Sequence, residues 1–328
     1  MKKILVIQTA STGDVILVTP LLEKLHHLYP DGVLDILIKK GNEGLFDAHP
    51  YLRQVWIWDK KMHKHRHLAG LILRIREEKY DLAINCQRFF ATGLITALSK
   101  AKISSGFRKN PLSLFFSHRY PHAIGKANIH EAHRNLTLIS FLGGSDDYPV
   151  RLYPSQLHEA LVSQYKTRAY ICIAPASLWF TKQYPERKWT EFIDALPGDL
   201  MVILLGSNAD KDLCNRIGSF ATHPFILNLA GKLNLLQSAS LMRDARMNFV
   251  NDSAPLHLAS AVNGPVAAVF CSTVPEFGFG PLSSISYTVE AKDKPTCRPC
   301  GLHGRNACPE KHFNCAHRIT TEQLLQCL

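Results

Sequence analysis

The sequence predicts two consecutive doubly wound α/β domains. Short runs of β-branched and other apolar residues alternate with longer amphipathic stretches in both halves of the chain, which is typical of right-handed βαβ units with a parallel sheet. A chain of 328 residues exceeds one comfortable core, so two domains are expected. Residues 143–154, rich in Gly, Asp and Pro, are the best linker. We therefore expect domains over residues 1–150 and 151–328.

The first half begins with a buried-type strand, Lys3–Gln8, and a polar loop, Thr9–Gly13. One amphipathic helix is expected over Asp14–Tyr29, because its leucines and valines recur at helical spacing. The elements expected after it are strand Val33–Ile38, strand Gln54–Trp58, helix Leu68–Glu78, strand Asp81–Asn85 and helix Ala91–Ser99.

The second half repeats this alternation. The expected strands are Ala169–Ala174, Leu200–Leu205, Phe225–Asn228, Met247–Asn251 and Val266–Phe270. The expected helices are Glu186–Ala195, Ala209–Phe220, Leu235–Arg243 and Ala254–Asn263. Ligands are expected at the carboxyl ends of the strands and in a cleft between the domains.

The composition, 46% hydrophobic and 20% charged, excludes a disordered or coiled-coil chain. No stretch approaches the roughly 18 uninterrupted apolar residues of a spanning helix. The first apolar run is too short for a signal peptide and is typical of a first strand. We therefore expect a cytoplasmic protein.

Positive charge is concentrated in the first half, where residues 1–150 carry +8 of the net +11. Between Asp81 and Glu131 the chain contains no acidic residue. That segment contains the basic residues Arg88, Lys100, Lys102, Arg108, Lys109, Arg119 and Lys126. This pattern favours a polyanionic partner, such as nucleic acid, an anionic membrane or a phosphorylated or carboxylated substrate. A solvated face that only maintains solubility is an equal alternative.

Several common enzyme classes are disfavoured by missing motifs. The first βα loop reads TASTGD, which lacks the GxGxxG fingerprint of dinucleotide binding. The sequence also lacks the GxxxxGK[ST] loop, the GxSxG elbow and the HExxH motif. These absences argue against a nicotinamide oxidoreductase and a P-loop NTPase.

Asp14 follows the first strand and lies at a helix start, where the helix dipole favours the ionised carboxylate. The alternative is a plain N-cap, worth about 1 kcal/mol and needing no chemistry. A second arrangement, residues 250–257, also follows a strand and opens a helix. There Asp252 and Ser253 lie where backbone N–H groups can hold a phosphate. His257, on the same turn, can point at the same anion.

Three segments together resemble glycosyltransferase family 9, the heptosyltransferases of the lipopolysaccharide core. Residues 11–22 (STGDVILVTPLL) are similar to its S-x-G-D-v-x-x-T-x-P signature, and residues 228–270 are similar to its donor-domain block. Residues 175–189 (PASLWFTKQYPERKW) resemble its loop in which a lysine precedes an aromatic–Pro pair. The resemblance covers both halves in the right order.

The resemblance implies two Rossmann-like domains facing across a cleft, the GT-B arrangement, and transfer of heptose from ADP-heptose with inversion. The first domain would bind the lipid-linked acceptor and the second, with a Cys-rich tail over residues 297–315, the nucleotide sugar. Asp14 matches the general base of the family, and no cofactor is required for catalysis. The residues that we assign to the acceptor side are Ser11, Thr12, Gly13, Arg108 and Lys109.

On the donor side, Lys182 matches the lysine that contacts the phosphates, and Ser177 matches a donor-contacting hydroxyl. Leu233 matches an apolar residue against the adenine. The D-[ST]-G-x-x-H segment of the family is matched by Asp252, Ser253, Ala254 and His257. Ala254 replaces the usual Gly, and Asn208 stands where some members have a Glu that contacts the ribose. These two departures leave donor orientation and base preference open.

The partners implied are ADP-heptose or a related nucleotide sugar and an anionic lipopolysaccharide-type acceptor, with the protein peripheral to the inner membrane. No nucleic acid is expected. One alternative is a GT-B transferase that uses another nucleotide sugar on a different glycan. The other, from a different class, is a zinc-containing nucleic-acid-binding protein.

The cysteines fall into two groups. Cys86, Cys172, Cys214 and Cys271 lie in or beside apolar runs and are expected in the core. The second group forms the pattern Cys297-x2-Cys300-x7-Cys308-x6-Cys315. It could close a structural zinc site, remain as packed or free thiols, or form disulfides. Each alternative makes the tail structural.

Overall fold

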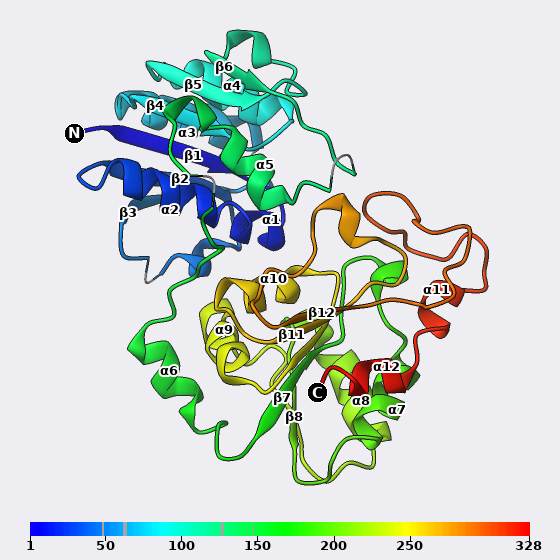
Figure 1. Ribbon diagram of the computed structural model, residues 1–328. Helices are drawn as coiled ribbons and strands as arrows, with labels where there is room; N and C mark the ends of the chain where they lie inside the picture. Colours follow the sequence, from blue (N-terminus) through cyan, green and yellow to red (C-terminus); the bar gives the residue numbers. More distant parts are fainter. Residues whose placement is uncertain (48, 62–63, 126–127, 146) are drawn as a thin grey trace. The chain divides into compact units, whose positions relative to one another are not determined.

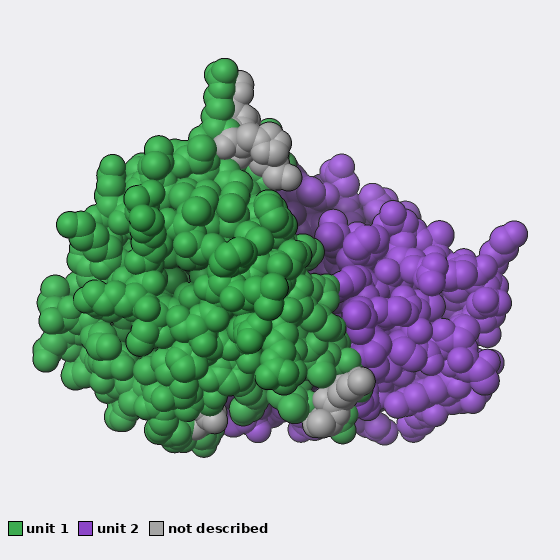
Figure 2. Space-filling view, turned by 90° about the horizontal axis from the view of Figure 1, so that it is seen from above, with its two compact units in different colours: residues 1–153 green, residues 154–328 purple. Residues whose placement is uncertain are grey.

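Each half of the chain folds around its own six-stranded sheet, and helices flank the strands (Figure 1). The computed structural model describes residues 1–328 except 48, 62–63, 126–127 and 146. The chain divides into unit 1, Met1–Tyr153, and unit 2, Pro154–Leu328 (Figure 2). The domain boundary expected from the sequence, after residue 150, lies three residues before this division.

Unit 1 has the sheet order β3-β2-β1-β4-β5-β6, with its pairings parallel. The strands are β1 (Lys3–Gln8), β2 (Val33–Lys39), β3 (Leu52–Trp58), β4 (Leu82–Asn85), β5 (Ile103–Phe107) and β6 (His118–Tyr120). The helices are α1 (Thr12–Ile16), α2 (Thr19–Leu28), α3 (Lys64–Glu77), α4 (Phe90–Leu98) and α5 (Glu131–Thr137), with short 3-10 turns η1 (Glu43–Leu45), η2 (Ser113–Phe115) and η3 (Ser140–Leu142).

Unit 2 has the sheet order β12-β11-β10-β7-β8-β9, again parallel. The strands are β7 (Tyr170–Ala174), β8 (Met201–Leu204), β9 (Ile226–Asn228), β10 (Asn248–Asn251), β11 (Val266–Val269) and β12 (Ser286–Val289). The helices are α6 (Gln156–Ser163), α7 (Glu186–Asp194), α8 (Lys211–Phe220), α9 (Leu235–Asp244), α10 (Ala254–Ala261), α11 (Asn314–His317) and α12 (Thr321–Leu325), with 3-10 turns η4 (Phe180–Lys182), η5 (Asn208–Asp210) and η6 (Pro275–Phe277).

Both sheets therefore have the doubly wound Rossmann order, read from opposite edges. In each sheet the first and fourth strands are neighbours at the centre, and the winding direction reverses between them. Such a switch point leaves an open crevice at the carboxyl ends of those two strands. The topology thus directs attention to the loops after β1 and β4 in unit 1 and after β7 and β10 in unit 2.

The helix expected over Asp14–Tyr29 is wrong as a single element. It is divided into α1 and α2, with Pro20 in the first turn of α2. Proline has no N–H to continue a helix through this point. The Thr19 hydroxyl instead donates to the Ile16 carbonyl at 2.8 Å. Pro20 was the sequence signal for this break.

Three strands were not expected from the sequence: β5, β6 and β12. β5 reads ISSGF, without an apolar run, yet four of its five residues are buried. The Ser105 hydroxyl donates to the Leu138 carbonyl, and Gly106 leaves room for the Phe116 ring. β6 has only three residues, and β12 exposes most of its length.

No helix among the described residues has the length and apolar character needed to cross a bilayer. Within the expected linker, the described residues 143–145 and 147–154 form no helix or strand. Asp146 lies outside the described residues.

Candidate functional site

Unit 2 carries a charged pair at its topological switch point. The Lys182 Nζ atom lies 2.7 Å from Asp252 Oδ2, and their side chains are only 15% and 8% exposed. Lys182 comes from the loop after β7, and Asp252 follows β10 directly. The Thr273 hydroxyl, after β11, donates to the same carboxylate oxygen at 2.6 Å. Three adjacent strands therefore contribute to one polar cluster.

A buried amide holds the loop that carries Lys182. Asn251 is 0% exposed, and its Nδ2 donates to the Pro175 carbonyl at 2.6 Å. Its Oδ1 accepts a hydrogen bond from the Tyr184 backbone N–H at 3.0 Å. Both ends of the loop 175–184 are thereby fixed to the end of β10.

The first turn of α10 begins at this cluster. Ser253 is its N-cap residue, with an extended backbone, and Ala254 is its first helical residue. The unpaired N–H groups of a helix start give partial positive charge and can bind an anion. His257 lies in the same turn, but its side chain is only 4% exposed and its ring packs edge-on against Phe279.

Ser177 lies on the braced loop and is half-buried, and its carbonyl accepts from the Gln183 amide at 2.6 Å. The described contacts therefore place Ser177 on the Lys182 loop. Lys182 and Asp252 are joined directly by their ion pair. Ser253 lies next to Asp252, as the N-cap residue of α10.

Asn208 and Leu233 lie on the loops after β8 and β9, further along the same sheet edge. The two loops are in contact, because the Gly231 N–H donates to the Gly206 carbonyl at 2.9 Å. Gly231 has φ +75°, and a Cβ there would lie 2.9 Å from Asn208 Cα. Only glycine therefore permits this close approach. Leu233 is half-buried beside it, two residues further on.

The Cys-rich tail is fastened to the Lys182 loop. The Thr181 N–H donates to the Arg305 carbonyl at 3.0 Å, and the Arg305 N–H donates to the Thr181 hydroxyl at 2.8 Å. The Ser272 hydroxyl also donates to Thr181, and the Ser272 carbonyl accepts from the Cys300 N–H. A Cβ on Gly304 would lie 2.9 Å from Lys182 Cγ, so the tail backbone lies directly against this side chain.

All nine cysteines are free thiols, so the disulfide alternative is wrong. The four expected core cysteines are buried, as predicted. Cys315 belongs to the core of unit 2, and Cys308 packs against that core. Burial, together with the neighbouring thiols, raises the pKa of Cys315 to about 11 and also raises the pKa of Cys300.

Among the described residues, no three His, Cys, Asp or Glu side chains are grouped to hold a metal ion. Cys297, Cys300 and Cys308 nevertheless lie near enough to Cys315 to contribute to its raised pKa, so the zinc alternative at these four cysteines stays a prediction. The burial of Cys315 and the packing of Cys308 against the core of unit 2 also agree with the packed-thiol alternative.

In unit 1, Asp14 lies after β1, at the switch point of that sheet. It is the third residue of α1, and Ser11 is the N-cap, so the alternative in which Asp14 itself is a plain N-cap is wrong. The Ser11 backbone N–H donates to Asp14 Oδ2 at 3.1 Å, and the Ser11 hydroxyl donates to the same oxygen. This capping box fixes the carboxylate at the helix start while leaving it partly exposed.

Neighbouring loops support this segment. The Thr12 hydroxyl donates to Asn42 Oδ1 at 2.8 Å, and Gly13 is buried in α1. The Lys60 ammonium donates to the Thr9 carbonyl at 2.7 Å and to its hydroxyl at 3.0 Å. Loops after β1, β2 and β3 are thus joined next to Asp14.

Arg108 and Lys109 are exposed on the loop after β5, two strands away from β1 at the same edge of the sheet. Arg108 Nε donates to the Arg119 carbonyl at 3.3 Å. Of the expected basic stretch, Lys126 lies outside the described residues. Lys102 forms an ion pair with Asp81 at 2.8 Å, at the opposite end of the strands. The stretch is therefore not one continuous surface.

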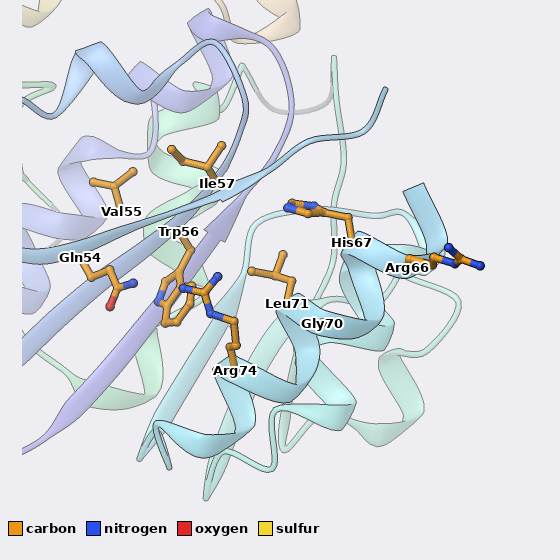
Figure 3. Close-up of a pocket in the computed structure, with 9 residues that line it drawn as sticks. All are labelled: Gln54, Val55, Trp56, Ile57, Arg66, His67, Gly70, Leu71 and Arg74. Atoms are coloured by element: carbon orange, nitrogen blue, oxygen red, sulfur yellow. The ribbon is translucent and has the colours of Figure 1, made fainter. Parts of the chain in front are cut away.

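A pocket of about 410 Å³ lies elsewhere in unit 1, between β3 and α3 (Figure 3). The Arg74 guanidinium lies over the Trp56 ring, 4.9 Å from its centroid. The residues that line this pocket come from β3 and α3, and none of them was predicted from the sequence to be a site residue.

Sequence reasoning missed four positioning residues around the described site: Asn251, Thr273, Thr181 and Lys60. Asn251 lay inside the second motif, and its asparagine at a strand end was a usable signal. The other three had no comparable signal, because each acts through a contact distant in the sequence.

Two doubly wound units, one of which has a lysine beside a helix start at its switch point, are the arrangement expected of a two-domain α/β protein that binds its ligands at the carboxyl ends of the strands. The model of glycosyltransferase family 9 (heptosyltransferase) matches residues 69–301, which is more than half of the chain. The chain belongs to glycosyltransferase family 9. The zinc-containing nucleic-acid-binding alternative is therefore wrong.

The relatives and solved structures agree with this assignment. Lipopolysaccharide heptosyltransferase 3 of Escherichia coli is 27% identical over 280 residues, covering 80% of this chain and 81% of the relative. The structure of E. coli ADP-heptose lipopolysaccharide heptosyltransferase II has a TM-score of 0.82 at 21% identity, covering 100% and 97% of the two chains. An E. coli heptosyltransferase with ADP-2-deoxy-2-fluoro heptose has a TM-score of 0.73 at 18% identity, covering 99% and 98%. The structural matches confirm the predicted GT-B fold class.

Proposed function

We propose that this protein transfers a heptose from ADP-heptose to a hydroxyl of a lipopolysaccharide-core-type acceptor, with inversion at the anomeric carbon. The Lys182–Asp252–Thr273 cluster at the start of α10 carries the proposal. A curated relative is named a lipopolysaccharide heptosyltransferase, and a solved relative holds an ADP-heptose analogue. Unit 2 is assigned the donor and unit 1 the acceptor.

The reaction is a single in-line displacement. The Asp14 carboxylate accepts the proton of the acceptor hydroxyl, whose oxygen attacks C1 of the heptose. The bond between C1 and the phosphate oxygen breaks, and ADP leaves with the bonding electron pair. Attack opposite the leaving group inverts the configuration at C1.

The departing diphosphate needs positive charge around it. Lys182 and the backbone N–H groups at the start of α10 can supply this charge without a divalent ion. Ala254 and Ser253 bring the backbone to the phosphates, while Asn208 and Leu233 are assigned the ribose and the adenine. His257, which is buried, is assigned to supporting the helix start rather than to direct contact.

We place the protein in the cytoplasm, peripheral to the inner membrane, where a lipid-linked anionic acceptor would lie. The alternative that the donor is a different nucleotide sugar stays open because of Asn208. Its amide can form hydrogen bonds to a ribose diol but adds no charge. No part of the proposal requires a cofactor for catalysis.

The test is transfer from a panel of nucleotide sugars to a purified core-type acceptor, followed by mass spectrometry. A gain of one heptose from ADP-heptose, with inverted anomeric configuration by NMR and with activity retained in EDTA, is expected. Transfer only from another nucleotide sugar would favour the alternative GT-B function. Loss of activity in EDTA, restored by a divalent ion, would contradict the metal-independent part.

A further inference from the structure

Two adjacent segments of unit 1 expose large apolar side chains. Phe89 and Phe90, at the start of α4, are 57% and 56% exposed. Leu114 and Phe115, in the short turn η2, are 79% and 70% exposed. Grouped exposure of such side chains marks an interaction surface on a soluble protein.

The two segments are joined by one buried side chain. Asn110 is 1% exposed, and its Nδ2 donates to the Gln87 carbonyl at 3.1 Å and the Phe89 carbonyl at 3.0 Å. A Cβ on Gly93 of α4 would lie 2.2 Å from Asn110 Oδ1, so glycine is required there. The start of α4 and the loop before η2 therefore form one structure.

The turn η2 is also held in place by a hydrogen bond and by a buried ring. The Ser113 hydroxyl donates to the Arg108 carbonyl at 3.1 Å, and Phe116 is 5% exposed against Gly106. A buried phenylalanine thus follows directly after two exposed apolar residues. The exposure of Leu114 and Phe115 results from a fixed turn rather than a loose loop.

Basic residues adjoin both apolar segments in the sequence, and the Arg88 guanidinium lies 5.8 Å from the centroid of the Phe89 ring. Arg88 precedes the two phenylalanines, and Arg108 and Lys109 lie on the loop that leads to η2. The sequence has no acidic residue between Asp81 and Glu131. Apolar tips with a cationic rim suit the interface of an anionic bilayer, where the rings enter the acyl boundary and the cations meet lipid phosphates.

We propose that this α4–η2 face, formed by Phe89, Phe90, Leu114 and Phe115 with Arg108 and Lys109, inserts into the surface of an anionic membrane. The inference deepens the proposed function, because it names the surface through which the protein reaches a lipid-linked acceptor. Donor binding in unit 2 does not depend on it.

The experiment is co-sedimentation of the full chain with phosphatidylcholine vesicles, with and without phosphatidylglycerol. The wild-type protein is expected to bind the anionic vesicles. The variant L114S/F115S is expected to bind about tenfold more weakly, since it removes apolar burial and keeps the charges. The matched control is F220S, which removes a phenylalanine that is 68% exposed at the end of α8 in unit 2, and it should bind like the wild type.

A second measurement reports insertion itself. In F115W, the added tryptophan emission should shift to the blue with anionic vesicles, beyond any change in the wild type. Unchanged vesicle binding in L114S/F115S, or an equal loss in F220S, would overturn the proposal. A wild-type dimer that L114S/F115S converts to a monomer, without vesicle binding by either, would identify the face as a contact between two copies and would also overturn it.

ADP-induced thermal stabilisation separates this proposal from the proposed function. L114S/F115S should keep the full ADP response, because unit 2 is unchanged. Absence of an ADP response in the wild type, with vesicle binding intact, would contradict the transferase proposal and leave the membrane face standing.

Discussion

The Lys182 ammonium and the Asp252 carboxylate, 2.7 Å apart, link the loops that follow β7 and β10. Both side chains are mostly buried, so each compensates the charge of the other. Removing one partner of such a pair leaves an uncompensated charge, which costs more than the pair itself contributes. The charge balance of the proposed donor site therefore depends on both residues.

The variant K182M should bind ADP about 10- to 100-fold more weakly, because one charge-assisted contact is worth about 1.5–3 kcal/mol. The unpaired Asp252 carboxylate would add repulsion against the diphosphate. Calorimetry with ADP measures the effect. The double variant D252N/K182M should recover part of the lost affinity, and equal ADP affinity in K182M and the wild type would reduce Lys182 to a structural partner of Asp252.

The variant D14N should retain ADP affinity and lose roughly 10²–10⁴-fold in turnover, the usual contribution of a positioned base. The asparagine oxygen can still accept the Ser11 backbone hydrogen bond, so α1 should keep its cap. The variant S11A, which removes one hydrogen bond to this carboxylate and keeps its charge, should lose much less turnover than D14N. Near-normal turnover in D14N would leave Asp14 as a capping residue only.

The rate of transfer to a phosphorylated acceptor should fall steeply as the salt concentration rises, mainly because the acceptor KM increases. Exposed charges such as Arg108 and Lys109 act over about 8–10 Å at physiological ionic strength. The donor KM should change much less, since Lys182 is mostly buried. The variant R108E/K109E should raise the acceptor KM and leave ADP binding unchanged, and equal salt sensitivity of both substrates would argue against this role.

His49 makes the stability of unit 1 sensitive to acid. Burial, with a smaller contribution from His26, lowers its pKa from 6.5 to about 4. Its ring packs against Tyr51 and Tyr153. As pH falls from about 6.5 to 4, the unfolded chain takes up a proton that the folded chain does not, so the free energy of unfolding decreases by up to roughly 3 kcal/mol.

Denaturant unfolding at several pH values measures this effect. In the variant H49F, the free energy of unfolding should decrease less between about pH 6.5 and pH 4 than in the wild type. The variant H133Q, at an exposed histidine, should behave like the wild type. Parallel curves for H49F and the wild type would show that another group titrates.

The variant T181V should weaken ADP binding several-fold while preserving both sheets. Valine keeps the shape of this buried side chain but removes the oxygen that accepts from Arg305 and Ser272, a loss of about 1–3 kcal/mol. Thermal unfolding and ADP titration give the two readouts. T181S, which keeps the oxygen, is the control, and an unchanged ADP affinity in T181V would make the tail contact irrelevant to the donor side.

The sequence allowed the strands with continuous apolar runs to be predicted well, and β1 has the predicted bounds, Lys3–Gln8. It failed at β5, whose Ser105 and Gly106 are buried because of a carbonyl and a ring from elsewhere in the chain. Such tertiary partners leave no periodic signal in the strand itself.

The same distinction applies to the site. Asp14, Lys182 and Asp252 could be found because motifs carry them. Their supports could not, since the Arg305 contact to Thr181 joins residues 124 positions apart. The N-cap alternative for Asp14 was wrong, because Ser11 three residues earlier takes that position.

The contact between Arg305 and Thr181 determines when, during synthesis of the chain, the proposed donor side can be completed. A ribosome releases the chain from its N-terminus, at about 5–20 residues per second. Lys182, Asp252 and the strands beside them therefore emerge before Arg305, whose backbone is hydrogen-bonded to Thr181 of the lysine loop. A chain released early, before residue 300, would contain Asp14, Lys182 and Asp252 and would lack that brace. Nucleotide binding is thus expected to mature only after Arg305 has left the ribosome.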